Sequence, residues 1–442
     1  MPFRPTNPRL LLTAASTAVA TLLMPTISSA ATTAPDPFFQ YTDSTPLSSF
    51  APGTVLKSRT ISVYIAGIKT TLKATQLVYR STDAMLRPAA NVTTVFTPDC
   101  SKASCENKNK VISYQSFYDS LNPEDGPSRA YAGGKRLPDL LPAVETVLFG
   151  TYVKKGYTVV ISDTEGQKAN FAAGPEYGYN TLDSIRATFN VPQIGLARSA
   201  KVVMMGYSGG AIATEWAAEL APTYAPDLKP NLIGAAFGGT LVSPEHNLTY
   251  VEGTPIWGGV MPMAVIGVSR SYEIDIQKYL TPRGLEVYDR IQKASIAYVL
   301  GQYSKATWKD LVKPEFQDRT KIPEYVEAVN KVIMGTGGTP EIPLQIGQGT
   351  GGIWEGTKPS PVWGKGDGVM LAGDVRTLAR QYCEQGVPVQ HKEWGSSHFV
   401  TMVNWLPWAT AWIDDRFAGK PAPQNCTSIA PGNSLAPIVY TP

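Results

Sequence analysis

Residues 200–212 read Ala-Lys-Val-Val-Met-Met-Gly-Tyr-Ser-Gly-Gly-Ala-Ile, with a Gly-x-Ser-x-Gly motif between an apolar run and a helical pattern. The run Ala200–Met205 predicts a buried strand, and Gly210–Leu220 predicts the helix that follows it. Glycines on both sides of Ser208 allow a tight strand-to-helix turn that exposes the serine hydroxyl above the sheet. The motif alone is a weak signal, but both flanking elements are present here. We therefore predict that Ser208 is a nucleophile at the end of a central strand.

Strands and helices alternate on both sides of this turn. The other predicted strands are Ile61–Tyr64, Lys73–Tyr79, Asn91–Phe96, Val111–Tyr114, Thr158–Ile161, Leu232–Phe237, Pro343–Gly347 and Val387–Lys392. The other predicted helices are Leu137–Leu148, Tyr179–Thr188 and Asp374–Gln385. Apolar strands that alternate with helices are typical of a mostly parallel sheet covered by helices on both faces. The predicted fold class is therefore α/β.

Between the predicted strands Leu232–Phe237 and Pro343–Gly347, the pattern changes to amphipathic helices. The helices predicted there are Tyr272–Leu280, Leu285–Leu300, Lys309–Val312 and Tyr325–Ile333. We interpret residues 243–340 as a helical cap inserted into a core formed by residues 31–242 and 341–442. An independent domain is the alternative, but the strands that resume afterwards indicate one sheet that needs both flanks. The Gly-rich stretch Gly347–Gly368 is predicted to be a long surface loop.

The first thirty residues have the order of a secretory signal peptide. Arg4 and Arg9 precede the apolar run Leu10–Met24, and Ser28-Ser-Ala30 offers small residues for cleavage. A membrane anchor is the alternative, but the run is shorter than the ~20 residues that a spanning helix needs. We therefore expect residues 1–30 to be removed and the mature chain to be secreted and extracellular, without an integral membrane segment.

The composition excludes several classes of protein. Hydrophobic residues make up 43% and charged residues 17% of the 442 residues, which is enough apolar material for a large core. The 39 basic and 36 acidic residues give a formal charge of +3, and loss of Arg4 and Arg9 leaves 37 against 36, or +1. A nearly neutral chain lacks the electrostatic signature of nucleic-acid binding. We expect a globular monomer that binds no nucleic acid.

Three histidines are candidates for the base that would activate Ser208. His246 begins the predicted cap, where a surface position is expected, and His391 falls inside a predicted strand. His398 ends the turn Gly395-Ser-Ser-His398, beyond the carboxyl end of that strand, where active sites of open α/β sheets gather. We therefore predict His398 as the general base.

The acid of a catalytic triad is expected between Ser208 and His398 in chain order. Asp367, in Gly364-Lys-Gly-Asp-Gly368, stands in a loop after a predicted strand. Its rivals are Asp374, whose expected role is a cap or first-turn charge of a helix, and Glu355 in the Gly-rich stretch. We predict Asp367, which would hold the tautomer of the imidazole and stabilise the imidazolium.

An oxyanion hole needs two hydrogen-bond donors. One is expected to be the backbone N–H of Gly209, which follows the nucleophile. The other is expected from the loop after the strand Val111–Tyr114, from Asp119 or its neighbours. An ordinary turn residue is the alternative interpretation of Asp119.

The four cysteines have no metal-site spacing with the histidines, and they allow three disulfide pairings. In an oxidising compartment we favour Cys100 with Cys105, which closes a short polar loop. The same choice pairs Cys383 with Cys426, which ties the C-terminal tail to a late helix. No metal or cofactor is expected.

Longer stretches of the chain resemble a known family. They are Asp36-Pro-Phe-Phe39, Ser113-Tyr-Gln115, Tyr118-Asp-Ser120, Ser162-Asp-Thr-Glu-Gly166, Tyr179–Ala187, Gly206–Ala211, Gly366–Met370 and Gly395–His398. With them the chain resembles the secretory lipase family typified by Candida antarctica lipase A, and especially its bacterial secreted members, over most of the mature chain. The resemblance implies an α/β-hydrolase fold with a helical lid. The stretch Gly351–Trp363 departs from the pattern of the family.

The resemblance also implies a site and an activity. The triad would be Ser208, Asp367 and His398, with Asp119 and Gly209 at the oxyanion hole, and a Cys pair like Cys383 with Cys426 is common in such lipases. The implied activity is hydrolysis of carboxylic esters, most specifically of triacylglycerol at a lipid–water interface, through an acyl-enzyme.

Two other functions stay open. One is an esterase or acyltransferase that acts on small soluble esters with the same triad, and the other is a non-catalytic secreted binding protein of this fold. The apolar run Ile256–Val265 is expected either to be core of the cap or to line a tunnel for an acyl chain.

Overall fold

The structure is a computed structural model that describes residues 36–98 and 105–442. The predicted signal peptide, residues 1–30, lies outside the described residues, so its cleavage stays a prediction. Cys100 lies outside them as well, and the pairing of Cys100 with Cys105 stays a prediction for the same reason. Within the two described ranges, no helix has both the length and the apolar character needed to cross a membrane.

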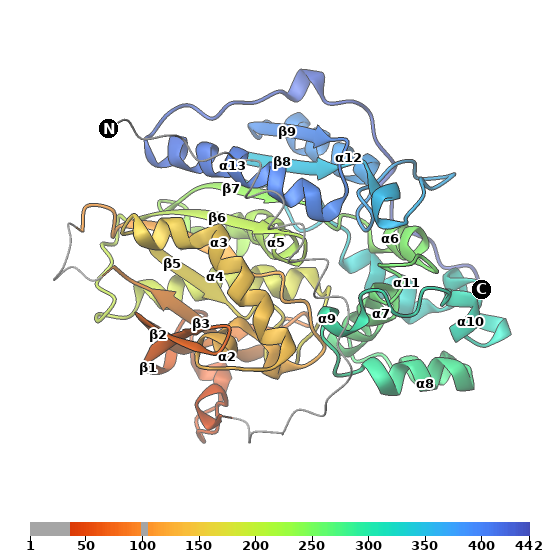
Figure 1. The fold of residues 1–442 in the computed structure, drawn as a ribbon, viewed down its shortest axis with the longest axis horizontal. Coiled ribbons are helices and arrows are strands. Elements are labelled where there is room, and N and C mark those ends of the chain that lie inside the picture. The colour runs from red at the N-terminus through yellow and green to blue at the C-terminus, as the bar shows by residue number, and fades with distance from the viewer. Residues whose placement is uncertain (1–35, 99–104) are drawn as a thin grey trace, which may run out of the picture. The chain divides into compact units, whose positions relative to one another are not determined.

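A nine-stranded sheet forms the centre of the described chain, in the order β1-β2-β3-β5-β4-β6-β7-β8-β9 (Figure 1). The strands are β1 (Val55–Ile65), β2 (Ile68–Thr82), β3 (Pro88–Phe96), β4 (Lys110–Gln115), β5 (Thr158–Ser162), β6 (Lys201–Tyr207), β7 (Leu232–Gly238), β8 (Leu344–Gly349) and β9 (Val389–Trp394). The first three strands and β5 pair antiparallel, and every pair from β5 to β9 is parallel. Every predicted strand overlaps an observed one, and the predicted α/β class is confirmed.

Helices cover both faces of this sheet. On one face lie α4 (Gly174–Phe189), α5 (Gly209–Tyr224) and α12 (Ala372–Glu384), which share a core with the strands. On the other lie α2 (Pro127–Tyr131), α3 (Leu140–Lys154) and α13 (His398–Phe417), with a second core. The central strands β5 and β6 are apolar on both sides because both of their faces are buried in this way. A Cys383–Cys426 disulfide joins α12 to the C-terminal tail, as the family resemblance implies.

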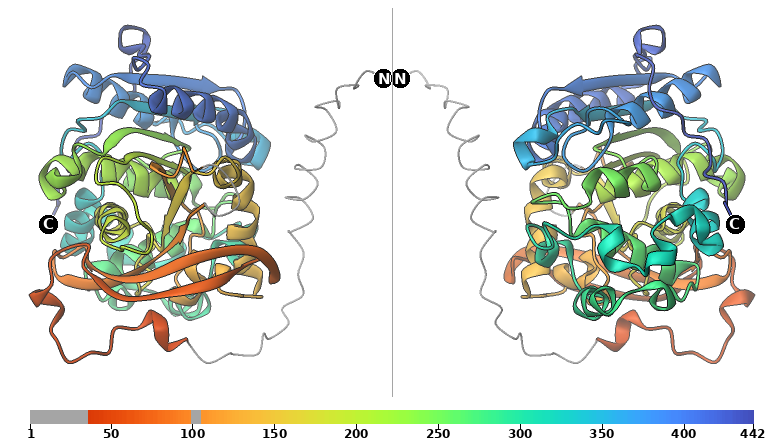
Figure 2. Two further views of the ribbon diagram at one scale, coloured as in Figure 1. Left: turned by 90° about the vertical axis from the view of Figure 1, so that its left-hand side faces the viewer. Right: turned by 90° about the vertical axis from the view of Figure 1, so that its right-hand side faces the viewer.

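Six α-helices lie between β7 and β8, in the segment predicted to be a cap (residues 243–340), and we call this segment the helical insertion. The helices are α6 (Pro244–Val251), α7 (Val260–Ser271), α8 (Pro282–Ile291), α9 (Ile296–Val299), α10 (Trp308–Leu311) and α11 (Pro323–Lys331). The insertion packs around a further hydrophobic core, to which Leu121, Phe171 and Val369–Leu371 also contribute, and it lies at the end of the sheet toward which β8 and β9 point (Figures 1 and 2). In open α/β sheets this end carries the ligand site.

The helices predicted within the insertion are partly wrong. The predicted helix Tyr272–Leu280 is only a short 3-10 turn, η6 (Ile276–Tyr279), because α7 ends at Ser271 and Glu273 takes a left-handed φ of 56°. The predicted helix Leu285–Leu300 is divided into α8 and α9. The residues between these two helices pair with the core instead: the Ala294 carbonyl accepts from Leu121 N–H, and Ser295 bridges Ser120.

The Gly-rich stretch is also more structured than predicted. Between β8 and α12 the chain forms a short 3-10 turn, η9 (Gly352–Glu355), and both Glu355 and Thr357 are buried. The N–H of Gly352 donates to the carbonyl of Gly366, so the stretch folds back on itself next to the start of α12. It is part of the interior at this end of the sheet, and not only a surface loop.

Candidate active site

Ser208 stands on a sharp turn between β6 and α5. Its φ of 56° and ψ of −122° put it in a strained conformation, and its N–H donates to the carbonyl of Gly238 in the neighbouring strand. A Cβ at Gly206 would lie only 2.2 Å from the carbonyl oxygen of Gly210, so the turn can close only with glycine at that position. The motif thus has the strand-turn-helix context that its sequence predicts.

The structure brings Ser208, His398 and Asp367 together. The Oγ of Ser208 lies 2.9 Å from Nε2 of His398, and Nδ1 of His398 lies 2.7 Å from Oδ2 of Asp367. The other carboxylate oxygen of Asp367 accepts from the N–H groups of Val369 (3.1 Å) and Met370 (2.8 Å), which fixes the orientation of the group. With Nδ1–H donating to Asp367, Nε2 is left as the acceptor that faces the serine hydroxyl.

His398 is the first residue of α13 and is almost fully buried. Burial lowers the pKa of its imidazole, but the charge and hydrogen bond of Asp367 raise it, together with the charges of Glu355 and Asp119. The net effect is a pKa above the ordinary value for histidine. A base with a raised pKa accepts the serine proton more readily, at the cost of being protonated at mildly acidic pH.

Asp119 and Gly209 face each other beside Ser208. A Cβ at Gly209 would lie 1.8 Å from Oδ1 of Asp119, so the carboxyl group lies directly against the N-terminus of α5. Asp119 has a positive φ of 31°, and its carbonyl accepts from the N–H of Ile296 in the helical insertion (2.8 Å). Burial raises the pKa of Asp119 to about 7, against the opposing effect of the charge of His398. A carboxyl group with this pKa is protonated in part at neutral pH and can then donate a hydrogen bond.

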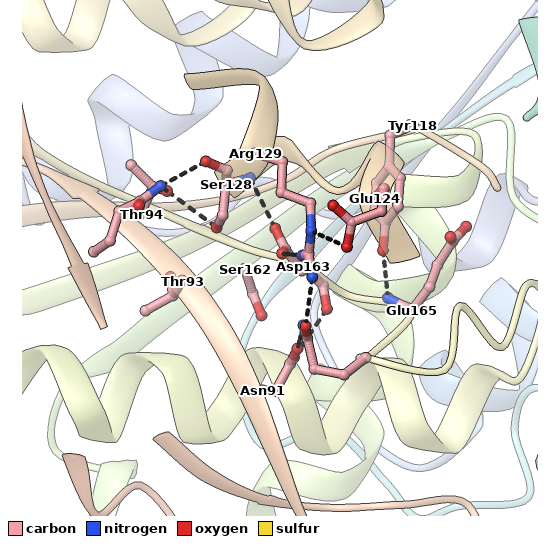
Figure 3. Close-up of polar contacts among 12 residues, drawn as sticks. Asn91, Thr93, Thr94, Tyr118, Glu124, Ser128, Arg129, Ser162, Asp163 and Glu165 are labelled. Carbon is pink, nitrogen blue, oxygen red and sulfur yellow. Dashed lines mark hydrogen bonds and ion pairs between the residues drawn. The ribbon is translucent and has the colours of Figure 1, made fainter. Parts of the chain in front are cut away.

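A network of polar groups, most of them buried, centres on Asp163 at the end of β5 (Figure 3). Asp163, which follows β5, accepts from the N–H of Ser128 (2.9 Å) and lies 3.3 Å from the guanidinium of Arg129. Arg129 also pairs with Glu124 at 3.1 Å, and the backbone carbonyl of Asp163 accepts from the side-chain amide of Asn91 (2.9 Å). The network joins β3, the end of β5 and α2.

Glu165, from the same motif, fixes the Asp119 loop directly. Its two carboxylate oxygens each lie 3.1 Å from the N–H of Ser120, and Tyr177 donates to one of them at 3.1 Å. Its own N–H donates to the hydroxyl of Tyr118 (3.0 Å; Figure 3). Residues on both sides of Asp119 are therefore bonded to this one segment. The sequence marks Glu165 as part of a motif but does not reveal this role, because Tyr118 and Ser120 are more than forty residues away in the chain.

The remaining predicted candidates lie elsewhere. His246 is buried, which corrects the expected surface position: its Nδ1 lies 3.1 Å from the carboxylate of Asp374, and its ring stacks on Trp363 at 3.6 Å. Asp374 is in the first turn of α12, as predicted for a first-turn charge. His391 lies within β9, where burial lowers its pKa to about 4. In the described parts of the chain, no three His, Cys, Asp or Glu side chains are arranged to hold a metal ion.

An apolar cavity begins at Ser208 and continues under the helical insertion. Ser208, Gly209 and Asp119 line it on the side of the sheet, and Trp257, Val260 and Met261 line it from the insertion. A second apolar cavity, lined by Val265, Val268 and Val329 among others, shares the wall residues Pro244, Leu248 and Ala264 with the first. The run Ile256–Val265 thus contributes both to the core of the insertion and to these cavities.

Comparisons with known proteins agree on one family. The family model described as "Secretory lipase" matches residues 135–425. Lipase 6 of Candida albicans is 32% identical over 368 residues, which cover 80% of this chain and 74% of that protein. A secreted triacylglycerol lipase of Malassezia furfur is 29% identical over 79% of this chain and 88% of that protein. A Mycobacterium tuberculosis protein named a probable inactive lipase is 28% identical, covering 84% and 79%.

The fold agrees with a solved structure as well. Candida antarctica lipase A is 27% identical and superposes with a TM-score of 0.76, over 90% of this chain and 89% of that one. This match identifies the nine-stranded sheet and its helices as an α/β-hydrolase fold, as the sequence resemblance implies. The chain therefore belongs to the secretory lipase family and is a lipase or esterase of that fold.

Proposed function

We propose that this protein is a secreted serine hydrolase of carboxylic esters, and specifically a triacylglycerol lipase, that works through an acyl-enzyme on Ser208. The observation that carries the proposal is the continuous chain of hydrogen bonds from Ser208 Oγ through His398 to Asp367, at 2.9 and 2.7 Å, beside an apolar cavity. A nucleophile, a base within hydrogen-bond reach and an acid that orients the base are the parts that acyl transfer requires.

The proposed reaction has two halves. His398 Nε2 takes the proton of Ser208 as Oγ attacks the ester carbonyl, and the imidazolium then gives that proton to the departing alcohol. Water repeats the sequence on the acyl-enzyme: it loses a proton to His398, its oxygen attacks the acyl carbon, and Ser208 recovers its proton as the acid is released. Asp367 stabilises the imidazolium in both halves.

We assign the oxyanion hole to Gly209 and Asp119. The N–H of Gly209 is at the N-terminus of α5, where the helix dipole also favours a developing negative charge. Asp119 faces the same point and, when protonated, would act as the second donor. The hydrogen bonds of Glu165 and of the insertion to this loop would keep both donors in position before substrate binds.

We also propose secretion and a lid function. The N-terminal residues 1–30 have the pattern of a signal peptide, and both the family description and the Malassezia furfur relative refer to secretion. Residues 243–340 would form the lid over a core of residues 31–242 and 341–442, because the insertion supplies one wall of the Ser208 cavity.

An esterase for small soluble esters is the second candidate, since the same triad would serve it. We expect purified mature protein to hydrolyse emulsified long-chain triacylglycerol as well as p-nitrophenyl butyrate. Hydrolysis of the soluble ester alone would favour the esterase, and no hydrolysis of any ester would favour a non-catalytic binding protein. An alkyl fluorophosphonate tests the nucleophile in the same samples: mass spectrometry is expected to find its label on Ser208, and a label on another serine would contradict the assignment.

The two apolar cavities lead to a prediction about chain length. Met261→Trp and Val265→Trp are each expected to lower kcat/KM for long-chain esters and to spare short-chain esters, because the indole fills space that the distal acyl chain would occupy. Each methylene excluded from apolar contact costs about 0.8 kcal/mol, so exclusion of about three methylenes lowers kcat/KM by roughly 50-fold. Val147→Trp on the exposed side of α3 is the control. Equal losses on long and short chains would mean that the cavities do not hold the acyl chain.

A further inference from the structure

Glu355 is a second buried carboxylate near His398. Asp367, and not Glu355, is bonded to Nδ1 of the imidazole. Glu355 ends the turn η9 and is 5% exposed. Its Oε1 accepts a hydrogen bond from the backbone N–H of Phe399 (3.0 Å), and its Oε2 accepts from the indole N–H of Trp257 (2.9 Å). One carboxylate oxygen is therefore bonded to the first turn of α13, beside His398, and the other to the helical insertion.

The indole that Glu355 holds lies against the catalytic base. The rings of Trp257 and His398 meet at an interplanar angle of 82° with centroids 5.2 Å apart, and Trp257 stacks on Phe399 at 5.2 Å and 28°. Trp257 also lines the cavity that contains Ser208. Through these contacts Glu355 joins three parts of the site: the insertion, the cavity wall and the helix that begins with His398.

The loop of the triad acid is shaped around this carboxylate. Gly368 follows Asp367 and has a φ of 130°, and a Cβ there would lie 2.7 Å from Oε2 of Glu355 and 2.9 Å from Nε1 of Trp257. The hydroxyl of Thr357, two residues after Glu355, donates to the carbonyl of Gly368 (2.7 Å). The backbone of the loop that contains Asp367 therefore lies so close to Glu355 and Trp257 that no side chain fits between them at position 368.

Glu355 also adds negative charge near a buried imidazole. His398 lies in the field of Asp367, Glu355 and Asp119, and all three carboxylates favour its protonated form. Burial raises the pKa of Glu355 above its ordinary value, and the charge of His398 and the hydrogen bonds to the carboxylate offset only part of this rise. The phenols of Tyr207, on β6, and Tyr250, on α6, also interact electrostatically with Glu355.

We propose that Glu355 is a positioning residue of this site: it holds Trp257 and the first turn of α13 against His398 and supplies a second carboxylate charge that stabilises the imidazolium. The proposal rests on the proposed triad. Glu355 takes no proton from substrate and touches no reacting atom. It acts through the base, so its contribution should be visible in the pH dependence of the reaction.

The test is the pH profile of Glu355→Gln on p-nitrophenyl butyrate. Gln keeps the shape of the side chain and removes its charge. The acid limb of kcat/KM reports the pKa of His398 in the free enzyme, and loss of a nearby negative charge lowers that pKa. We expect the limb to move toward lower pH by roughly one unit, the lower end of what a single close charge produces. At one unit below the wild-type midpoint, the rate relative to each plateau would then be roughly fivefold higher in the variant.

Two further variants complete the experiment. Glu384→Gln on α12 removes an exposed carboxylate and should leave the limb in place. Trp257→Phe keeps the carboxyl group of Glu355 but removes one of the hydrogen bonds that stabilise its ionised form. The acid limb should therefore also move toward lower pH, by less than in Glu355→Gln. This variant also keeps the proposal testable if Glu355→Gln does not fold.

A purely structural role for Glu355 would lower the thermal stability of Glu355→Gln and leave the midpoint of its acid limb unchanged. That result, or an unchanged limb in Trp257→Phe when Glu355→Gln is unfolded, would overturn the proposal. A wild-type protein that hydrolyses no ester, or that reacts with the fluorophosphonate at a serine other than Ser208, would instead contradict the proposed function.

Discussion

Ser208→Ala is expected to lower kcat on p-nitrophenyl butyrate by a factor on the order of 10⁶, because no other group can form the acyl-enzyme. The loss should be one of chemistry and not of folding. Among the hydrogen bonds of the described residues, the hydroxyl of Ser208 takes part only in the one with His398. Alanine can also occupy the same strained backbone position, since it adds no atom. The measurement is steady-state hydrolysis together with thermal unfolding of both proteins.

Ser48→Ala is the matched control, because Ser48 is exposed in the N-terminal segment of the described chain. It should hydrolyse the ester at the wild-type rate. Ser208→Ala should keep a melting temperature within a few degrees of wild type and should no longer react with the fluorophosphonate. Ester hydrolysis that survives in Ser208→Ala at more than about one per cent of the wild-type rate would mean that the nucleophile is a different residue.

The strand-turn-helix unit around Ser208 could be predicted because its signals are local. The apolar run of β6 is buried on both faces, and steric limits at Gly206 and Gly210 require glycine at these two positions of the motif. The same reasoning holds for β5 and β7. A strand that is buried on both faces needs apolar side chains at nearly every position. A short apolar run in the sequence is therefore enough to identify it.

The helical insertion was harder to predict because tertiary contacts override its helical pattern. The stretch Leu285–Leu300 has continuous helical periodicity, but the chain breaks it so that Ala294 and Ser295 can bond to the segment around Ser120. A periodic pattern indicates which face of a helix is apolar. It does not indicate which backbone groups form hydrogen bonds with a distant segment instead of within the helix. The surface position predicted for His246 is wrong for a similar reason: its partner Asp374 lies 128 residues away in the chain.

Glu355 illustrates the part of a site that sequence patterns do not reveal. Its neighbours in the chain are glycines and an exposed tryptophan, Trp354, which favour a surface loop. Its partners Trp257, in the turn before α7, and Phe399, in α13, are 98 and 44 residues away. The sequence offers Glu355 only as a rival for the acid of the triad. No motif spacing connects the three residues, so their contacts are visible only in the three-dimensional arrangement.

Asp367→Asn is expected to lower kcat by roughly 10⁴, the loss that follows when the orienting acid of a triad is replaced by its amide. The cause can be derived from the contacts of Asp367. Its Oδ1 accepts from two backbone N–H groups, so the amide oxygen of asparagine would take that position. The amide NH₂ would then face Nδ1 of His398, which can meet it only as an acceptor. The proton would move to Nε2, and the imidazole could no longer accept the proton of Ser208.

Asp374→Asn is the matched control for this change, since it replaces a second buried aspartate seven residues away and tests the rival acid at the same time. Asp374 accepts from the side chain of Asn433 (2.6 Å) and contacts His246, and it is not bonded to His398. Its variant should lose thermal stability but keep kcat within about threefold of wild type, because charged hydrogen bonds of this kind contribute about 1.5–3 kcal/mol to folding. If Asp374→Asn lost activity by four orders of magnitude and Asp367→Asn did not, the acid of the triad would have to be reassigned. The two variants thus separate a carboxylate that sets the tautomer of the base from one that only supports the fold around it.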